Sequence, residues 1–139
     1  MFVLDTNVLS EMMRSEPDSK VAAWVSARPA SSLFTTTVTQ AEILYGLGLL
    51  PSGKRRADLE AAVSEVFATD FVGRVLPFDQ AAAHAYAEIA VARRRGGRPI
   101  TQLDAQIAAI ARSRDADLAT RNIADFEDCG IDVIDPWRG

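Results

Sequence analysis

Short apolar runs of the kind that form buried strands alternate with longer segments of helical periodicity along the whole chain. Parallel strands need long crossover connections, which helices usually supply, so this alternation predicts a parallel sheet covered by helices on both faces. The length of 139 residues fits one α/β domain of ordinary size. We expect the strands of that domain at residues 1–5, 33–38, 74–78, 117–120 and 131–134.

The segments between these runs carry apolar residues three or four positions apart, which is the spacing of a helix face. Turn residues mark several ends: Pro51 to Gly53 stops one helix, and Gly96 follows another. Asp79 stands where the N-terminal cap of a long alanine-rich helix is expected. We expect helices at residues 8–13, 18–27, 40–49, 54–71, 80–95 and 101–114.

The composition is that of a folded protein of the cell interior. Hydrophobic residues make up 48% of the chain, which is enough for a sizeable core. The net charge of −4 argues against a general nucleic-acid coat protein but is compatible with a nuclease. The one cysteine, Cys129, can form neither an intrachain disulfide nor a zinc site, which favours a reducing compartment. We see no membrane span and no signal peptide, so we expect a cytoplasmic location.

Acidic side chains follow the expected strands, at the edge where open α/β sheets bind ligands. Asp5 ends the first strand, Glu42 lies beyond the second, and Asp104 lies in the first turn of a helix. Asn122 and Asp125 follow the fourth strand. Carboxylates about 4 Å apart repel each other by about 4 kcal/mol at an effective dielectric constant of about 20, so such a cluster needs protons or a cation. Oxygen ligands without histidine or cysteine favour Mg²⁺ or Mn²⁺.

Helix capping offers a structural explanation for each acid taken singly. Thr39 with Glu42 and Thr101 with Asp104 both have the spacing of a capping box, and each cap is worth about 1 kcal/mol. Asp5 would likewise favour the dipole of the helix that follows it. Capping does not explain three acids at one edge of one sheet, so their joint position favours a metal site.

Four blocks of the sequence resemble the signature blocks of PIN-domain proteins, and in particular the VapC toxin group and its FitB-like branch. The blocks are "FVLDTNVLSEM", "TTTVTQAEILYGL", "PITQLDAQIAAIA" and "LATRNIADFEDCGIDVIDPW". They occur in the family's order and span nearly the whole chain, so the resemblance implies a single PIN domain over residues 1–139. It also implies a PIN-like three-layer fold, with a mainly parallel central sheet of four or five strands flanked by helices.

The resemblance further implies an endoribonuclease that depends on Mg²⁺ or Mn²⁺. Asp5, Glu42 and Asp104 match the three core acidic positions of the family. The fourth acidic position most often falls where this chain has Asn122, which carries no charge. Asp125, three residues on, is the expected substitute for that ligand.

Three more residues match polar positions that orient the acids in the family: Thr6, Asn7 and Thr120. The partners that the resemblance implies are a second copy of the chain and a VapB- or FitA-type antitoxin encoded beside it. The C-terminal segment of such an antitoxin typically lies along a helical groove and can direct a basic side chain at the acidic pocket, which electrostatic complementarity favours.

Basic clusters are the expected contacts to RNA phosphates. The main cluster comprises Arg93, Arg94, Arg95 and Arg98, and a second one comprises Lys54, Arg55 and Arg56. The alternative reading is a solvated helix end, because arginine near a helix C-terminus also favours the helix dipole.

The expected reaction is hydrolysis of RNA phosphodiester bonds by a metal-activated water, which requires no histidine. The one histidine, His84, lies within a helix among alanines and is read as a packing or surface residue. Two other functions stay open. A phosphatase with an aspartyl nucleophile would use Asp-x-Asp, but the third residue here is Asn7. A binding module that sequesters RNA or antitoxin without efficient cleavage would fit Asn122. The P-loop motif of nucleotide hydrolases is absent.

Overall fold

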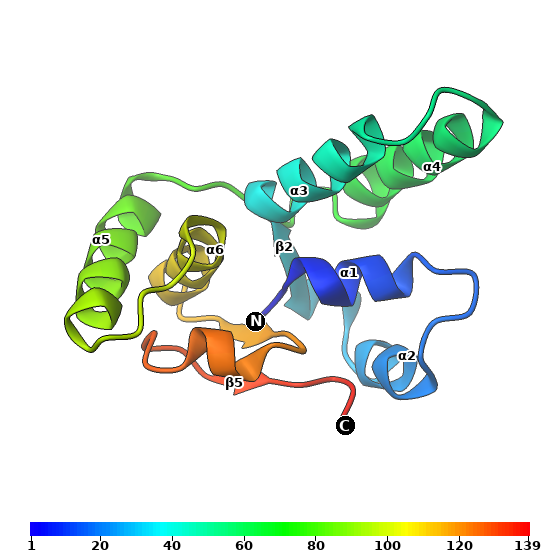
Figure 1. Ribbon diagram of the computed structural model, residues 1–139. Helices are drawn as coiled ribbons and strands as arrows, with labels where there is room; N and C mark the ends of the chain where they lie inside the picture. Colours follow the sequence, from blue (N-terminus) through cyan, green and yellow to red (C-terminus); the bar gives the residue numbers. More distant parts are fainter.

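The computed structural model describes residues 1–139 and shows one parallel sheet between two layers of helices (Figure 1). The strands are β1 (Phe2–Leu4), β2 (Leu33–Thr36), β3 (Val75–Leu76), β4 (Asp117–Ala119) and β5 (Val133–Ile134). Their order is β3-β2-β1-β4-β5, and every neighbouring pair is parallel. The five expected strands and the three-layer PIN-like arrangement are therefore confirmed, with shorter strands than the sequence suggested.

Six α-helices connect the strands. They are α1 (Thr6–Met12), α2 (Ser19–Ser26), α3 (Thr37–Gly48), α4 (Lys54–Glu65), α5 (Gln80–Arg95) and α6 (Gln102–Ser113). A π-helical turn, η2 (Val66–Asp70), continues α4, and the short 3₁₀ turns are η1 (Ala30–Ser32) and η3 (Ile123–Phe126). No helix combines the length and the apolar character that a membrane crossing needs.

Alternate residues of the central strands pack against opposite helical layers, because successive side chains of a strand point to opposite faces. Val3 of β1 belongs to the large core cluster with residues of α5 and α6, such as Ile89 and Ile107. The next residue, Leu4, belongs to a second cluster with Val8 of α1 and residues of α2. The centre of the sheet is thus buried on both faces.

The start of α3 differs from the sequence prediction. We expected Val38 to end a strand and Thr39 to cap the helix, but the cap is Thr36, whose Oγ1 accepts a hydrogen bond of 3.0 Å from the amide of Thr39. Thr36 has the extended backbone that a cap requires, so the helix begins at Thr37. The proposed capping box from Thr39 to Glu42 is therefore wrong, and Glu42 lies more than one turn inside α3.

The other two caps are as predicted. Asp79 accepts a hydrogen bond of 3.0 Å from the amide of Ala82 at the start of α5, and Thr101 accepts one of 3.3 Å from the amide of Asp104 at the start of α6. The cap at Thr101 fixes the first turn of α6, and with it the position of Asp104.

Helices α3 and α4 pack side by side and form an arm that projects from the rest of the domain (Figure 1). Leu47 of α3 packs with Val63 of α4 and with Phe67 of the π-helical turn. Leu9 of α1 belongs to the same cluster, so the arm is joined to the first helix through a small apolar core of its own.

Candidate active site

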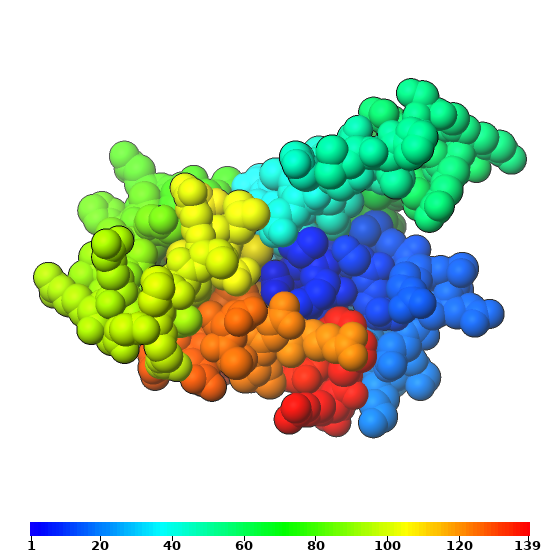
Figure 2. Space-filling model, in the orientation of Figure 1, coloured from blue at the N-terminus to red at the C-terminus, as the bar shows by residue number.

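Four segments that are distant in sequence converge at the carboxyl ends of β1 and β4. They are the residues after β1, the first half of α3, the start of α6 and the segment after β4. In the space-filling view they meet near the centre of one face, as dark blue, cyan, yellow and orange atoms (Figure 2). The predicted metal ligands and the residues predicted to orient them lie on these four segments.

Asp5 is the buried centre of this region, with 5% of its surface exposed. Its Oδ1 accepts a hydrogen bond of 2.8 Å from the amide of Thr6. Through this bond Asp5 caps the N-terminus of α1. Its Oδ2 accepts one of 2.7 Å from the hydroxyl of Thr120 and a longer one of 3.5 Å from Nδ2 of Asn7. Both oxygens are therefore fixed in direction before any ligand arrives.

Glu42 is tied to the same network through Thr6. The hydroxyl of Thr6 donates a hydrogen bond of 2.9 Å to Oε1 of Glu42 and lies 3.1 Å from the hydroxyl of Thr39. Thr6 thus contacts Asp5 through its backbone and Glu42 through its side chain. Thr39 is buried beside them and was missed as a site residue, because its spacing to Glu42 resembled a helix cap.

Asp104 occupies the third position of α6 and is half-buried. Burial is the largest influence on its pKa, which is raised, and the negative charge of Asp125 raises it further. The hydrogen bond with Thr101 and the charge of Arg93 act in the opposite direction. Asp104 therefore lies within electrostatic range of both Asp5 and Asp125.

Burial raises the pKa of Asp5 to about 6 from an ordinary value of 3.8. The hydrogen bonds from Thr120 and Thr6 oppose this shift, whereas the negative charges of Asp104 and Glu42 add to it. The three carboxylates that the sequence placed together are thus close enough to influence one another. The charge of Asp125 raises the pKa of Asp104, so these two carboxylates also influence each other.

No lysine or arginine forms an ion pair with any of these four acids. No three acidic, histidine or cysteine side chains meet closely enough to enclose a metal ion by themselves. Mg²⁺ does not require such a cage, because it keeps several water ligands and usually binds through one or two carboxylates and substrate phosphates. The carboxylate oxygens of the site are therefore ligands of the type that a hard divalent cation such as Mg²⁺ prefers.

The segment after β4 carries the two alternatives for the fourth ligand, and both are exposed. The amide of Asn122 donates a hydrogen bond of 3.1 Å to Oγ1 of Thr120, so Asn122 is tied to the residue that holds Asp5. Asp125 lies within η3, and its amide donates to the carbonyl of Asn122 at 3.1 Å. Both positions are thus anchored at the rim of the site.

Arg93 does not belong to an exposed basic cluster. It is 7% exposed, and its guanidinium donates hydrogen bonds to the carbonyls of Arg98, Asp125 and Glu127 at 2.8–3.0 Å. The prediction that this side chain meets RNA phosphates is corrected accordingly, because its donors already serve the loop after β4. Arg98 is exposed but paired with Glu127 and Asp128, whereas Arg94 and Arg95 are exposed and have no ion pair.

The sequence and structure of this chain are similar to a well-defined set of proteins. The model of the PIN domain family matches residues 2–130. The VapC ribonuclease Y4jK of Sinorhizobium fredii is 39% identical over 138 residues, which cover 99% of both chains. The toxin FitB of Neisseria gonorrhoeae is 34% identical with the same coverage, and the plasmid stability protein StbB of Pseudomonas syringae pv. tomato is 40% identical.

Solved structures of proteins of the same types are also similar to this chain. The structure of FitAB bound to an IR36 DNA fragment matches with a TM-score of 0.92 and 34% identity, covering 99% of this chain and 96% of that one. FitAcB from Neisseria gonorrhoeae matches with a TM-score of 0.89 and 32% identity over 100% of both chains. DNA-bound VapBC from Salmonella typhimurium matches with a TM-score of 0.79, 27% identity and 97% coverage of both chains. The chain therefore belongs to the PIN-domain family, within its group of VapC- and FitB-like proteins.

Proposed function

We propose that this chain is a Mg²⁺- or Mn²⁺-dependent endoribonuclease and the toxin of a type II toxin–antitoxin pair. The observation that carries the proposal is the cluster of Asp5, Glu42 and Asp104, with which no basic side chain forms an ion pair. Relatives that cover almost the whole chain support it, since they are named as a VapC ribonuclease, a tRNA(fMet)-specific endonuclease and a FitB toxin.

Asp5, Glu42 and Asp104 would hold the divalent ion, with Asp125 as the fourth carboxylate. The bound ion would supply an activated water and positive charge beside the phosphate oxygens. The protein's own contribution is to hold the carboxylates in place, which Thr120 does for Asp5 and Thr6 does for Glu42. Such preorganised groups avoid the cost of reorientation during the reaction.

The products distinguish this hydrolysis from attack by the RNA 2′-hydroxyl. Attack by water leaves 5′-phosphate and 3′-hydroxyl ends, whereas attack by the 2′-hydroxyl leaves 2′,3′-cyclic phosphates. The second route normally requires a general base such as histidine. The one histidine, His84, is exposed on α5 and hydrogen-bonds to none of the acids, so we expect the first set of ends.

The test is cleavage of RNA by the purified, antitoxin-free protein in Mg²⁺ or Mn²⁺, with end-group analysis of the products. Asp5→Ala and a chelator should each abolish cleavage. Cyclic phosphate ends, or equal cleavage by Asp5→Ala, would refute the proposal. An RNA complex without cleavage would instead favour the alternative of a PIN-fold binding module, for which the uncharged Asn122 is the motivating observation.

A groove along the arm is the proposed seat of the antitoxin segment. It runs between α1, α3 and α4, with Met13, Ile43 and Leu59 among its apolar walls. Thr6 and Glu42 line the same groove. A bound segment could therefore place apolar residues along the arm and a basic side chain beside Glu42, where it would compete with the metal.

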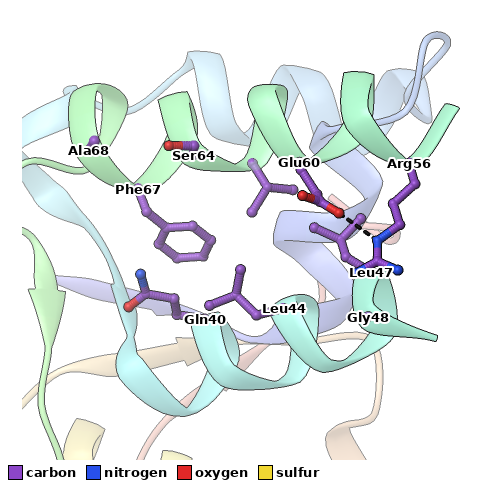
Figure 3. Close-up of a pocket in the computed structure, with 10 residues that line it drawn as sticks. Gln40, Leu44, Leu47, Gly48, Arg56, Glu60, Ser64, Phe67 and Ala68 are labelled. Carbon is purple, nitrogen blue, oxygen red and sulfur yellow. Dashed lines mark hydrogen bonds and ion pairs between the residues drawn. The ribbon is translucent and has the colours of Figure 1, made fainter. Parts of the chain in front are cut away.

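A second hollow lies between α3 and α4 and contains none of the site's acids. Leu44, Phe67 and Arg56 are among its lining residues, and Arg56 forms an ion pair with Glu60 there (Figure 3). A segment seated in this hollow would leave the carboxylates open. The groove that includes Glu42 is thus the one whose occupation would stop cleavage.

The related structures FitAB and VapBC are complexes of more than one kind of chain, and some contain DNA. We propose an antitoxin of the FitA or VapB type as the partner here, with the DNA-binding part on the antitoxin. We also propose a homodimer of this chain within that assembly. Tyr45 and Leu103 form an exposed apolar surface beside Glu42, which a second copy would cover.

A further inference from the structure

Arg121 is fixed beside the carboxylates by hydrogen bonds of the backbone at and next to it. Its own amide donates to Oδ1 of Asn7 at 3.3 Å, and the amide of Asn122 donates to the hydroxyl of Thr120 at 3.1 Å. Asn7 and Thr120 both hydrogen-bond to Asp5. The backbone of Arg121 is therefore part of the network that orients the central acid, and its side chain must begin at the rim of the site.

The side chain of Arg121 leads toward the C-terminal segment. Its guanidinium carbon lies 5.0 Å from the centre of the Trp137 ring, which is a cation–π contact. Trp137 is itself half-buried against the core cluster of α1 and α2, and its amide is bonded to Asp135. Such a contact at an exposed position favours one direction of the side chain without removing its charge.

Arg121 is exposed and has no carboxylate partner. The next arginine along the chain, Arg138, pairs with Asp135. Arg98 pairs with Glu127 and Asp128. Arg94 and Arg95 are also unpaired, but they lie in the last turn of α5 and share no hydrogen bond with the acids. Arg121 is thus a free cation whose backbone is bonded to the acid network.

We infer that Arg121, supported by Trp137, binds a phosphate of the RNA strand next to the bond that is cut. This inference rests on the proposed function and names a substrate contact for the same site. The acids around Asp5 repel a phosphodiester strand, so a cation at the rim has to offset that repulsion as the strand approaches. Guanidinium suits this task because its planar donors match two phosphate oxygens at once.

The contact is tested with Arg121→Ala and with Arg114→Ala as its matched control. Both changes remove one exposed arginine from a segment flanking β4, but Arg114 precedes the strand and pairs with Asp79 at 3.6 Å. A third variant, Trp137→Leu, keeps an apolar side chain against the core and removes only the ring beneath the guanidinium. Thermal unfolding of all three checks that each is folded.

Two measurements are made on each variant. Binding of a fluorescein-labelled single-stranded RNA oligonucleotide is followed by anisotropy in EDTA, at several salt concentrations. Cleavage of the same RNA is followed in Mn²⁺, with kcat and KM determined separately. We expect Arg121→Ala to weaken binding about 10-fold and to raise KM more than it lowers kcat. The slope of log affinity against log salt should fall by about 0.7, which is the value for one phosphate contact on a single strand.

Arg114→Ala should match the wild type, and Trp137→Leu should lie between the wild type and Arg121→Ala. If the wild type cleaves RNA but Arg121→Ala binds and cleaves like Arg114→Ala, this inference is overturned and the proposed function stands. If the wild type binds RNA through Arg121 but never cleaves, the contact stands and the nuclease proposal falls. If the wild type neither binds nor cleaves RNA, both are overturned.

Discussion

The hydroxyl of Thr120 donates a hydrogen bond of 2.7 Å to Oδ2 of Asp5, and this bond joins the carboxyl ends of β4 and β1. The two residues are 115 positions apart, and Thr120 is completely buried. The same hydroxyl oxygen accepts the amide hydrogen of Asn122. A buried threonine thus sets the direction of the central carboxylate and of the segment that follows β4.

Thr120→Val should lower the activity of the site while leaving the fold intact. Valine keeps the shape and the burial but removes the donor to Asp5, and loss of a partner that orients a metal ligand typically costs about 10–100-fold in metal affinity or activity. We expect the Mn²⁺ concentration for half-maximal cleavage to rise by that order. Thr120→Ser retains the hydroxyl and serves as the control. Equal metal dependence of the valine and serine variants would contradict this role.

Asp5 should give the metal-free protein a distinctive dependence of stability on pH. Its pKa is about 6 when folded and 3.8 ordinarily, so the folded state binds the proton more tightly. The stabilisation from that proton is fully present below about pH 3.8 and is lost as pH rises through 6. The shift corresponds to about 3 kcal/mol.

The measurement is urea unfolding in a chelator from pH 4 to pH 7, for the wild type and Asp5→Asn. The wild type should lose stability relative to Asp5→Asn as pH rises across this range. Addition of Mg²⁺ at pH 7 should restore stability to the wild type alone. A difference between the two proteins that does not vary with pH would show that Asp5 ionises normally in the folded chain.

Asn122→Asp should tighten divalent metal binding. The backbone of Asn122 is bonded to Thr120, so a carboxylate at this position would add charge close to Asp5. We expect about 10-fold higher Mn²⁺ affinity by titration calorimetry. Asp125→Asn is the paired experiment, and it should weaken binding because Asp125 is the proposed fourth carboxylate. If Asp125→Asn binds Mn²⁺ like the wild type, Asp125 is not a ligand.

Arg93→Met should destabilise the protein, because the carbonyl of Asp125 would lose its side-chain donor. The carbonyl of Glu127 would keep only the weak thiol donor of Cys129. Loss of a partner for a buried polar group costs about 1–3 kcal/mol. Arg94→Met changes the same residue type at the next position of α5, but Arg94 is exposed, so it should shift stability by less than about 0.5 kcal/mol. Chemical unfolding of both variants separates a structural arginine from a surface one. Equal stabilities would contradict the assignment.

Leu59→Lys should weaken antitoxin binding without reducing RNA cleavage by the free protein. Leu59 lines the groove that includes Glu42, and a lysine there would oppose an apolar antitoxin segment. Leu49→Lys is the control, since Leu49 is exposed on the same arm and lines neither hollow. Co-purification with the cognate antitoxin measures the effect. If both variants retain the antitoxin equally, the segment lies elsewhere.

Local sequence patterns predicted the parts of the site that local structure determines. Asp5 follows an apolar strand, and Asp104 lies three residues after a capping threonine, so both could be placed before the fold was known. The start of α3 could not, because Thr39 and the three consecutive threonines before Val38 are all possible caps, and only the structure shows that Thr36 is the one used. Arg93 was misassigned because its burial depends on a loop more than 30 residues away.

Thr39 and Arg121 are two residues near the acids whose contacts the sequence did not predict. Thr39 contacts Thr6 only because β1 and β2 are neighbours in the sheet. Arg121 meets Trp137 only because β4 and β5, which precede these two residues, are also neighbours. No periodicity or spacing in the sequence signals either contact. Relationships of this kind become visible only when distant segments are brought together.

The central place of β1 in the sheet has a consequence for synthesis of the chain. β1 is translated first, yet its two partners are β2 and β4, and β4 begins only at Asp117. A ribosome therefore completes most of the polypeptide before the carboxylates can assemble. A chain that terminates before Thr120 lacks both β4 and the hydroxyl that holds Asp5, so an unfinished product cannot form the complete carboxylate network.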